Sequence, residues 1–277
     1  MSSLAGIIDV KVALLPSWAI LLIYVAILSL IVGIATWRRW LTLSGNVAAF
    51  MLGLFILYLG GFSSFFLLFF FFLAGSVLGK ISKSFNDLEK KSGARDCFQV
   101  LANGLPALLG LFIFKFTPYN DAGLIAFSAA IAEALADTWS GDIGRLSRKD
   151  PVSIITFTRV PRGISGGVTA LGFMGGLLAS FLVSLLYLGT FNFSLWSFLI
   201  VLGFGFLGSI FDSVLGATIQ VHYRDEEGRL TEKEYTNGKK NERVRGIPFI
   251  DNDAVNFLSG LFSMAFAFLF SSLIYHI

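Results

Sequence analysis

The sequence predicts an all-α protein, a polytopic bundle of about eight transmembrane helices with a possible weak internal repeat. Of its 277 residues 55% are hydrophobic and only 14% are charged, whereas soluble domains carry about 25% charge. The mean hydropathy of +0.76 agrees with this class. Eight spans of about 20 residues each need roughly 160 residues, which the apolar content supplies. We expect residues 1–277 to form a single integral membrane domain.

Eight apolar segments are candidates for these spans, and each has a recognisable boundary. The first ends before Arg38 and Arg39. The second and third are separated by Gly60-Gly61, which is either a tight turn or a kink within one irregular segment. The later spans are bounded by basic loops. The predicted spans are 18–36, 46–60, 62–79, 98–115, 122–139, 163–188, 195–220 and 252–275.

Basic residues are concentrated in alternate loops. The loops 37–45, 80–97, 140–162 and 221–250 hold 19 of the 21 Lys and Arg residues. Because cytoplasmic loops carry an excess of Lys and Arg, these loops are predicted to be cytoplasmic and both termini to lie outside. The N-terminal segment has neither a cleavage site of small residues nor a transit-peptide composition. We therefore expect a prokaryotic plasma membrane protein.

Several polar side chains fall within the predicted spans, near their cytoplasmic ends. A charged group at membrane depth is costly and indicates a functional site. Glu133 and Asp137 share a helix face because they are four residues apart. Asp142 follows just past the cytoplasmic end of the same span. Polar groups of three other spans lie at a similar depth: Asn103, Asp212, and Asp251, Asn252, Asp253 and Asn256 at the start of the eighth span. Carboxylates and amides that converge in this way suit Mg²⁺, which prefers oxygen ligands. An interhelical packing cluster and a proton or cation pathway are the alternatives.

A basic, glycine-containing segment lies next to the first acidic stretch. Arg159 and Arg162 precede Gly163, Ser165, Gly166 and Gly167 at the predicted start of the sixth span. Backbone N–H groups at a helix N-terminus bind phosphate, and arginines add bidentate contacts. We expect a phosphate site here. The glycines could equally serve close helix packing, the main role expected for Gly172 and Gly176.

The sequence also contains a short internal echo. Asp137-Thr-x-x-Gly141 matches Asp212-Ser-x-x-Gly216, and the Arg159–Ile164 stretch resembles Arg243–Ile247. A duplicated helix pair would leave such symmetry, with a binding site between the halves. A third basic segment, Ser92–Asp96 with Arg95, precedes the fourth span. The loop 221–235 is expected to form a small hairpin, either a lid or a solvated feature, with His222 on its surface.

This combination of groups indicates phosphoryl or nucleotidyl transfer to a lipid. Such a reaction needs Mg²⁺ and cationic side chains around the transferred group. A phosphate acceptor is already a nucleophile at neutral pH, so the site needs no strong general base. The sequence has no suitably placed Ser/His or Cys/His set and no Walker-type glycine loop. The single cysteine, Cys97, excludes a multi-cysteine metal site.

Several motifs in the same order resemble one integral membrane family, from about Lys80 to Ser263. The family includes transmembrane protein 19 and the phytyl-phosphate kinase of tocopherol synthesis in plants and cyanobacteria. The motifs are Gly93-Ala94-Arg95-Asp96, Ala102-Asn103-Gly104, Ala136-Asp137-Thr138, Gly141-Asp142-Ile143-Gly144, Gly166-Gly167-Val168 and Asp251-Asn252-Asp253. The resemblance implies phosphoryl transfer from a nucleoside triphosphate to an isoprenyl monophosphate of the phytyl or geranylgeranyl type. A looser likeness to lipid kinases that use CTP suggests CTP as the donor.

Under this hypothesis Asp137, Asp142, Asp212 and Asp253 hold Mg²⁺, and Asp137, Asp142 and Arg162 are the catalytic residues. The expected substrate-binding residues are Arg95, Asn103, Arg159, Gly163, Ser165, Gly166, Gly167, Arg245, Asn252 and Asn256. The partners are the membrane lipid, the isoprenyl phosphate and the nucleotide, with no nucleic acid. The alternatives are a lipid cytidylyltransferase, a CTP-dependent lipid alcohol kinase and an ion-coupled transporter.

Overall fold

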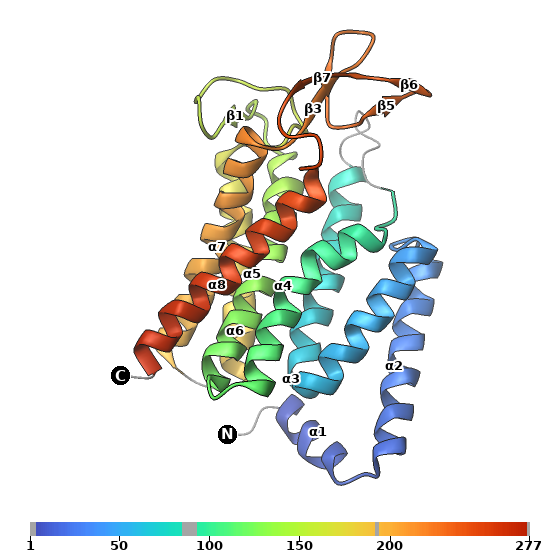
Figure 1. Cartoon of the computed structure of the whole chain (residues 1–277), viewed down its shortest axis with the longest axis vertical. Coiled ribbons are helices and arrows are strands. Elements are labelled where there is room, and N and C mark those ends of the chain that lie inside the picture. Colours follow the sequence, from blue (N-terminus) through green and yellow to red (C-terminus); the bar gives the residue numbers. More distant parts are fainter. Residues whose placement is uncertain (1–3, 85–92, 192–193, 276–277) are drawn as a thin grey trace.

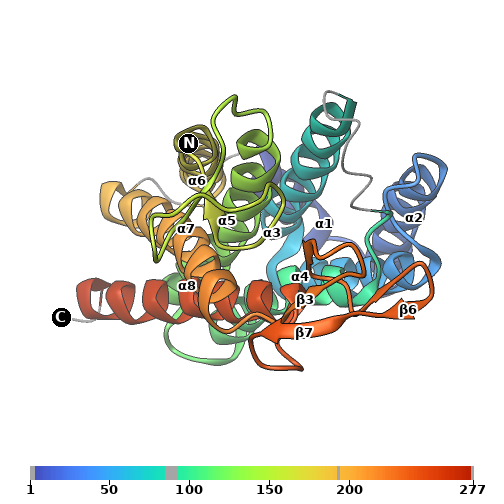
Figure 2. The ribbon, with the colours of Figure 1, turned by 90° about the horizontal axis from the view of Figure 1, so that it is seen from above.

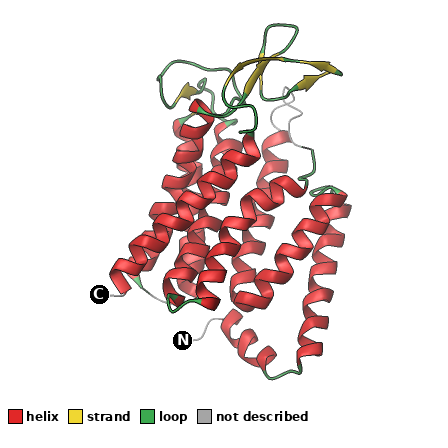
Figure 3. Ribbon diagram, viewed as in Figure 1, coloured by secondary structure: helices red, strands yellow, loops and turns green. Residues whose placement is uncertain are grey.

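The computed structural model describes residues 4–84, 93–191 and 194–275. This part of the chain is a helical bundle, as predicted, and seven of its helices are long and apolar enough to cross a membrane. Figure 1 shows both chain termini at one end of the bundle. The strands and the long connections gather at the opposite end, here called the loop end (Figure 3). The helices are α1 (Leu4–Ala13), α2 (Ser17–Trp37), α3 (Leu43–Ser84), α4 (Cys97–Phe116), α5 (Asn120–Gly144), α6 (Ala170–Thr190), α7 (Leu195–Thr218) and α8 (Asn252–Tyr275).

Helix α3 contains the second and third predicted spans and folds back between them. Gly61 has φ 68° and ψ −167°, a non-helical conformation that glycine adopts without steric cost. The two halves lie side by side, since a Cβ on Gly53 would be 3.5 Å from the ring of Phe65. The described part of the chain therefore crosses the bundle eight times, because α3, one of the seven helices of membrane length, crosses it twice. Of the predicted loop 80–97, residues 85–92 with Lys90 and Lys91 lie outside the described residues.

The short helix α1 was not predicted, and it supports the bend of α3. Its Asp9 carboxylate accepts hydrogen bonds from the backbone N–H groups of Phe62 (2.6 Å) and Ser63 (3.1 Å), and from the Ser63 hydroxyl (2.6 Å). The first N–H groups of a helix have no partner within the helix. Asp9 therefore caps the second half of α3 from a distant part of the sequence.

Helix α5 is the centre of the bundle and packs against α3, α4, α6, α7 and α8. Figure 2 shows these helices around it, with α2 at the edge of the bundle. Its many alanines allow close approach, and Ala126, Ala129, Ala132 and Ala136 are buried. A Cβ on Gly172 would lie 2.7 Å from the Ser140 carbonyl oxygen, and one on Gly176 would lie 3.2 Å from that of Ala136. The packing role predicted for these two glycines is confirmed.

Among the described residues, three small antiparallel sheets cover the loop end. β1 (Val152–Ser153) pairs with β2 (Gly167–Val168), and β5 (Tyr235–Thr236) with β6 (Lys239–Lys240). The third sheet has the order β4 (Leu230–Thr231), β3 (His222–Arg224), β7 (Glu242–Arg245). Its β3–β4 hairpin was predicted, but His222 is fully buried rather than on the surface. The predicted start of the sixth span at residue 163 was also wrong, because α6 begins at Ala170.

Candidate functional site

A cavity of about 600 Å³ lies at the loop end, between α3, α4, α5, α7, α8 and the 145–169 connection. It collects most of the predicted site residues from segments that are far apart in the sequence. The predicted residues that line it are Arg95, Asn103, Asp137, Asp142, Arg162, Gly163, Ser165, Gly166, Gly167, Asp212, Asn252 and Asn256. Acidic side chains lie on its helical walls, and basic side chains lie mainly where the walls meet the loops.

The two aspartates of the internal echo face each other in this cavity. Asp137 on α5 and Asp212 on α7 both line the cavity, and their carboxyl groups lie close enough to interact with each other. Two ionised carboxylates repel at this range, so the pair favours a proton or a cation between them. With its amide nitrogen turned toward them, Asn256 on α8 donates to Asp212 Oδ2 (3.0 Å) and to the carbonyl oxygen of Asn252 (3.2 Å). Three helices thus contribute oxygen or amide groups to one position.

A buried hydroxyl extends this pair toward the middle of the bundle. Ser259 Oγ lies 3.1 Å from Asp212 Oδ2 and 2.8 Å from Glu133 Oε1. Glu133 is only 2% exposed and does not line the cavity. The Ser259 hydroxyl of α8 thus joins Glu133 of α5 and Asp212 of α7. Because a buried polar group without a partner is costly, these contacts help to fix the positions of the three helices beneath the site.

Asp142 makes an ion pair rather than joining the other carboxylates. Its Oδ1 accepts a hydrogen bond from Arg145 Nη1 at 3.2 Å, one helical turn further on. Its carbonyl oxygen accepts a hydrogen bond of 2.8 Å from the Ser82 hydroxyl of α3. Arg145 also lines the cavity, together with Lys80 and Lys149. None of these three was predicted as a site residue. The i, i+3 spacing of Asp142 and Arg145 does indicate that their side chains can pair on one helix face.

The predicted phosphate segment is a loop, not the first turn of a helix. Gly163 and Gly166 have φ values of 78° and 82°, which side chains other than glycine rarely adopt. A Cβ on Gly166 would lie 2.5 Å from the backbone nitrogen of Ala217, so the loop lies directly against α7. Helix α6 itself is capped by Thr169, whose Oγ1 accepts from the Gly172 N–H at 3.0 Å. Thr169 occupies this N-terminus, and in the loop the N–H groups of Ser165 and Gly167 already donate to Glu232 Oε1 and to the Ile164 carbonyl oxygen. An anion bound at the loop would therefore use its other N–H groups.

Glu232, the residue that follows β4, holds this loop through its side chain. Glu232 Oε1 accepts a hydrogen bond from the Ser165 backbone N–H at 2.7 Å. The same oxygen lies 4.0 Å from Nε2 of the buried His222. The Nδ1 of His222 is 3.0 Å from the Gln220 carbonyl oxygen, which fixes the ring. The hairpin therefore positions the glycine loop over the cavity.

Arg95 is held by its own backbone at the junction of α4 with the cavity. Its N–H donates to the Trp40 carbonyl oxygen (2.9 Å), and its carbonyl oxygen accepts from the Thr42 N–H (3.0 Å). The guanidinium carbon lies 5.7 Å from the centre of the Phe71 ring. Burial lowers the pKa of Arg95 from its usual value, and nearby Asp142 opposes that shift. Arginine stays charged at neutral pH in any case, so a fixed cation lines the cavity here.

Three predicted site residues do not line the cavity. Arg159 is exposed in the loop, where its backbone pairs with Val152. Arg245 lies on β7, and its guanidinium donates to the Ala217 carbonyl oxygen at 3.3 Å. Asp253 lies near Asp96 and Asp251. The internal echo therefore brings Asp137 and Asp212 to the same cavity. Arg245, the counterpart of Arg162, lies outside that cavity because it belongs to strand β7.

The expected set of four metal-binding carboxylates is not assembled. Among the described residues, no three Asp, Glu, His or Cys side chains converge closely enough to hold a metal ion. Only the Asp137–Asp212 pair remains, with Asn256 beside it. Mg²⁺ is commonly bound by one or two carboxylates together with water and substrate phosphates. The residues present therefore fit a metal that binds with its phosphate substrate, and do not fit a closed protein site.

Comparison with known proteins identifies the family. Residues 26–264 match the family described as "Integral membrane protein DUF92". The chain belongs to this family. "Protein PGR" of Arabidopsis thaliana is 33% identical over 270 residues, covering 86% of this chain and 92% of that protein. An "Uncharacterized membrane protein" of Methanocaldococcus jannaschii is 33% identical over 66% of this chain and 76% of its own length.

A further relative matches about half of the chain. "Protein VTE6, chloroplastic" of Arabidopsis thaliana is 28% identical over 152 residues, 52% of this chain and 46% of that protein. The family inferred from the motifs is thereby confirmed, and the chain is an integral membrane protein. No solved structure matches the chain.

Proposed function

We propose that this DUF92 protein is a membrane-embedded prenyl-phosphate kinase. It transfers the γ-phosphoryl group of a nucleoside triphosphate, with CTP the leading candidate, to an isoprenyl monophosphate of the phytyl or geranylgeranyl type. One observation carries the proposal: the carboxylates of Asp137 and Asp212 and four arginines line one cavity at the end of a membrane bundle. The arginines are Arg39, Arg95, Arg145 and Arg162. This pairing of groups suits phosphoryl transfer, in which positioning and charge neutralisation supply most of the catalysis.

In the proposed reaction an oxygen of the acceptor monophosphate forms a bond to the γ-phosphorus. The bond from that phosphorus to the β–γ bridging oxygen breaks, which gives a prenyl diphosphate and a nucleoside diphosphate. Arg95, Arg145 and Arg162 would hold the phosphates. The 163–167 loop would orient the donor through N–H groups other than those of Ser165 and Gly167, which already have protein partners. Asp137 and Asp212 would hold Mg²⁺, which neutralises charge on the transferred group. Asp142 would position Arg145 through their ion pair.

The loop end is the proposed cytoplasmic face, where nucleoside triphosphates are available. The basic loops gather there and support this orientation. An ion-coupled transporter requires access to its carboxylates from both sides in turn. All the residues that line this cavity belong to the loop-end part of their helices or to the connections. A cytidylyltransferase would use similar groups, but it would release pyrophosphate and leave a nucleotide on the lipid.

A transfer assay tests the proposal. Purified protein in detergent is incubated with Mg²⁺, one γ-labelled nucleoside triphosphate at a time, and geranylgeranyl or phytyl monophosphate. We expect label in the prenyl diphosphate. The Asp137→Asn variant should lose at least about 100-fold in turnover, the scale on which enzymes lose rate when one electrostatic group of the site is removed. Asp121→Asn, an exposed aspartate at the opposite end of α5, is the matched control and should behave as wild type. Full activity of Asp137→Asn would refute the site.

A further inference from the structure

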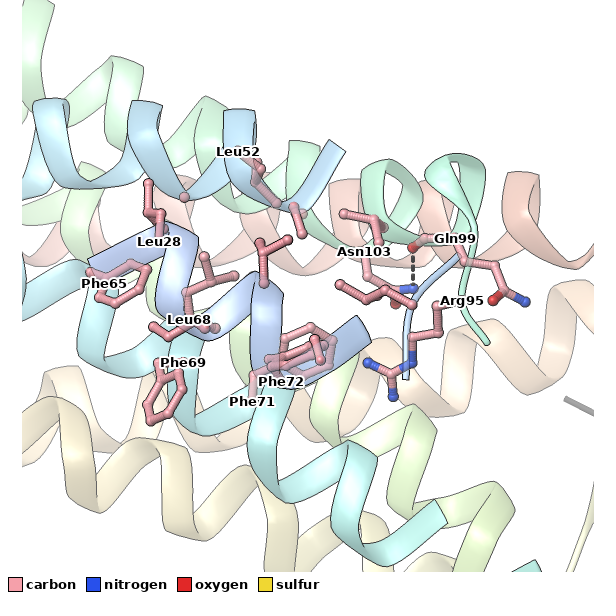
Figure 4. Close-up of a pocket in the computed structure, with 18 residues that line it drawn as sticks. Leu28, Leu52, Phe65, Leu68, Phe69, Phe71, Phe72, Arg95, Gln99 and Asn103 are labelled. Carbon is pink, nitrogen blue, oxygen red and sulfur yellow. Dashed lines mark hydrogen bonds between the residues drawn. The ribbon is translucent and has the colours of Figure 1, made fainter. Parts of the chain in front are cut away.

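A second space in the protein is almost entirely apolar. It lies between α2, the two halves of α3, and α4, and it is here called the apolar crevice (Figure 4). Apolar side chains form most of its wall, among them Leu28, Leu52, Phe65, Phe69 and Phe72. Polar side chains line it only at the loop end, where Arg95, Gln99 and Asn103 are found. A space of this composition suits a hydrocarbon group with a polar head at one end.

The apolar crevice and the polar cavity share a wall. Arg95, Gln99 and Asn103 line both spaces. The Asn103 side chain donates to the Gln99 carbonyl oxygen at 2.8 Å, which fixes its position at the junction. The Arg95 guanidinium lies over Phe71, which lines the crevice, and a Cβ on Gly75 would be 3.0 Å from its Nη2. A molecule that extends from one space into the other would place an anionic head beside Arg95 and an apolar tail among the phenylalanines.

The crevice is small and lies at the edge of the bundle. Its free volume is about 70 Å³, and a water-sized group needs about 10–15 Å³ by this measure. The space therefore matches about one isoprene unit, not a complete prenyl chain. Phe65 and Phe72, which both line the crevice, are seven residues apart on α3. At a rise of 1.5 Å per residue the crevice therefore extends about 10 Å along this helix. Ile31 and Val32 of the edge helix α2 line the space and are only half-buried, so lipid chains can reach it from the bilayer side.

We propose that the apolar crevice receives the first isoprene unit of the acceptor, next to its phosphate, while the rest of the tail extends into the bilayer. This inference rests on the proposed kinase function and adds a rule of selectivity. The protein should recognise the branched unit adjacent to the phosphate and be insensitive to chain length beyond it. Geranyl, geranylgeranyl and phytyl monophosphates, which share that unit, should react with kcat/KM values within about threefold, whereas an unbranched saturated alkyl phosphate should be at least tenfold poorer.

Two substitutions with matched controls test the crevice. Ala49→Leu adds bulk to its wall, and the control Ala26→Leu adds the same bulk on the exposed face of α2. Phe72→Leu enlarges the crevice, and its control is Phe66→Leu on the exposed side of the same helix. We expect Ala49→Leu to lower kcat/KM for every prenyl phosphate at least tenfold without changing the KM for the nucleotide. Phe72→Leu should reduce the preference for prenyl over alkyl phosphate at least threefold.

A binding measurement separates failure of this inference from failure of the kinase proposal. A prenyl monophosphate with a diazirine on its first isoprene unit is photolysed with the full-length protein, and the labelled peptides are identified. Label in α2, α3 or α4 that Ala49→Leu abolishes and Ala26→Leu retains would support the crevice, even without phosphoryl transfer to any acceptor. Active protein in which both alanine variants behave alike and the label lies elsewhere would overturn it. If Ala49→Leu does not fold, the folded Phe72→Leu variant decides. An unchanged preference for prenyl over alkyl phosphate in that variant would overturn the proposed role of the crevice.

Discussion

Replacing Arg95 by Gln should weaken use of the lipid acceptor while leaving the fold intact. The backbone of Arg95, not its side chain, makes the hydrogen bonds to Trp40 and Thr42, so the junction should persist in the variant. The lost guanidinium removes a charge-assisted contact to phosphate, worth about 1.5–3 kcal/mol. At 1.36 kcal/mol for each factor of ten, this corresponds to a roughly 10- to 150-fold loss in kcat/KM for the acceptor.

Steady-state kinetics with acceptor and donor varied separately measure this loss. Arg95→Lys keeps the charge but not the planar fork, and should lie between wild type and Arg95→Gln. Burial lowers the pKa of Arg95, so its charge is lost at a lower pH than that of a free arginine, but the ordinary pKa of arginine lies so far above neutrality that the side chain stays charged in the assay range. We therefore expect the effect of Arg95→Gln to be constant between about pH 6 and 9. Arg229→Gln, in the exposed hairpin, is the control. Unchanged kcat/KM for both substrates in Arg95→Gln would refute the assignment.

Three further predictions concern the loop and the metal. Gly166→Ala should raise the KM for the nucleotide at least fivefold, because the positive φ and the contact with Ala217 both exclude a side chain; an unchanged KM would count against the loop as a phosphate site. Glu232→Ala should raise the KM for the nucleotide about 3- to 10-fold, because it removes the acceptor of the Ser165 N–H. Glu232→Gln, whose amide oxygen can accept the same hydrogen bond, should have a KM close to that of wild type. Equal KM values for the two variants would contradict this role. Chelation of divalent ions should abolish turnover reversibly but leave the thermal unfolding temperature within about 2 °C, because the described residues form no closed metal site; a large fall in that temperature would indicate a structural metal instead.

The helical spans were predictable because apolar length and basic loops are local properties of the sequence. The bend of α3 was predictable only as an ambiguity, since Gly60-Gly61 is compatible with both a turn and a kink. What decides between them is the conformation of Gly61 together with the cap from Asp9. That cap joins residues more than fifty positions apart and gives no local signal. Helix α1 was missed for a different reason: its ten residues are too few for a membrane span.

The candidate site was predictable where its residues project directly from helices. Asp137, Asp212 and Asn256 lie on helices whose ends meet, and their depth in the predicted spans already placed them together. Arg245 was misplaced because the strand pairing of β7 directs its side chain toward Ala217, and strand register is not visible in so short a segment. Asp142 was grouped with the metal ligands because its pairing with Arg145 was overlooked.

The apolar crevice could not be predicted at all. Its wall combines one face of α2 with both halves of the α3 hairpin and the start of α4. Each of these segments is apolar on most sides, so the sequence does not reveal which face encloses a space and which faces lipid. Only the packing of the helices shows that Arg95, Gln99 and Asn103 separate an apolar space from a polar one.

The central claim is that the cavity transfers one phosphoryl group to a lipid monophosphate. Mass spectrometry of both products after incubation of wild-type protein with CTP, Mg²⁺ and geranylgeranyl monophosphate tests this most directly. We expect geranylgeranyl diphosphate and CDP in equal amounts, and neither product with Asp137→Asn. Pyrophosphate together with a cytidylyl lipid would contradict it in favour of nucleotidyl transfer. Folded wild-type protein that yields no lipid product with CTP or any other nucleoside triphosphate would contradict the kinase itself.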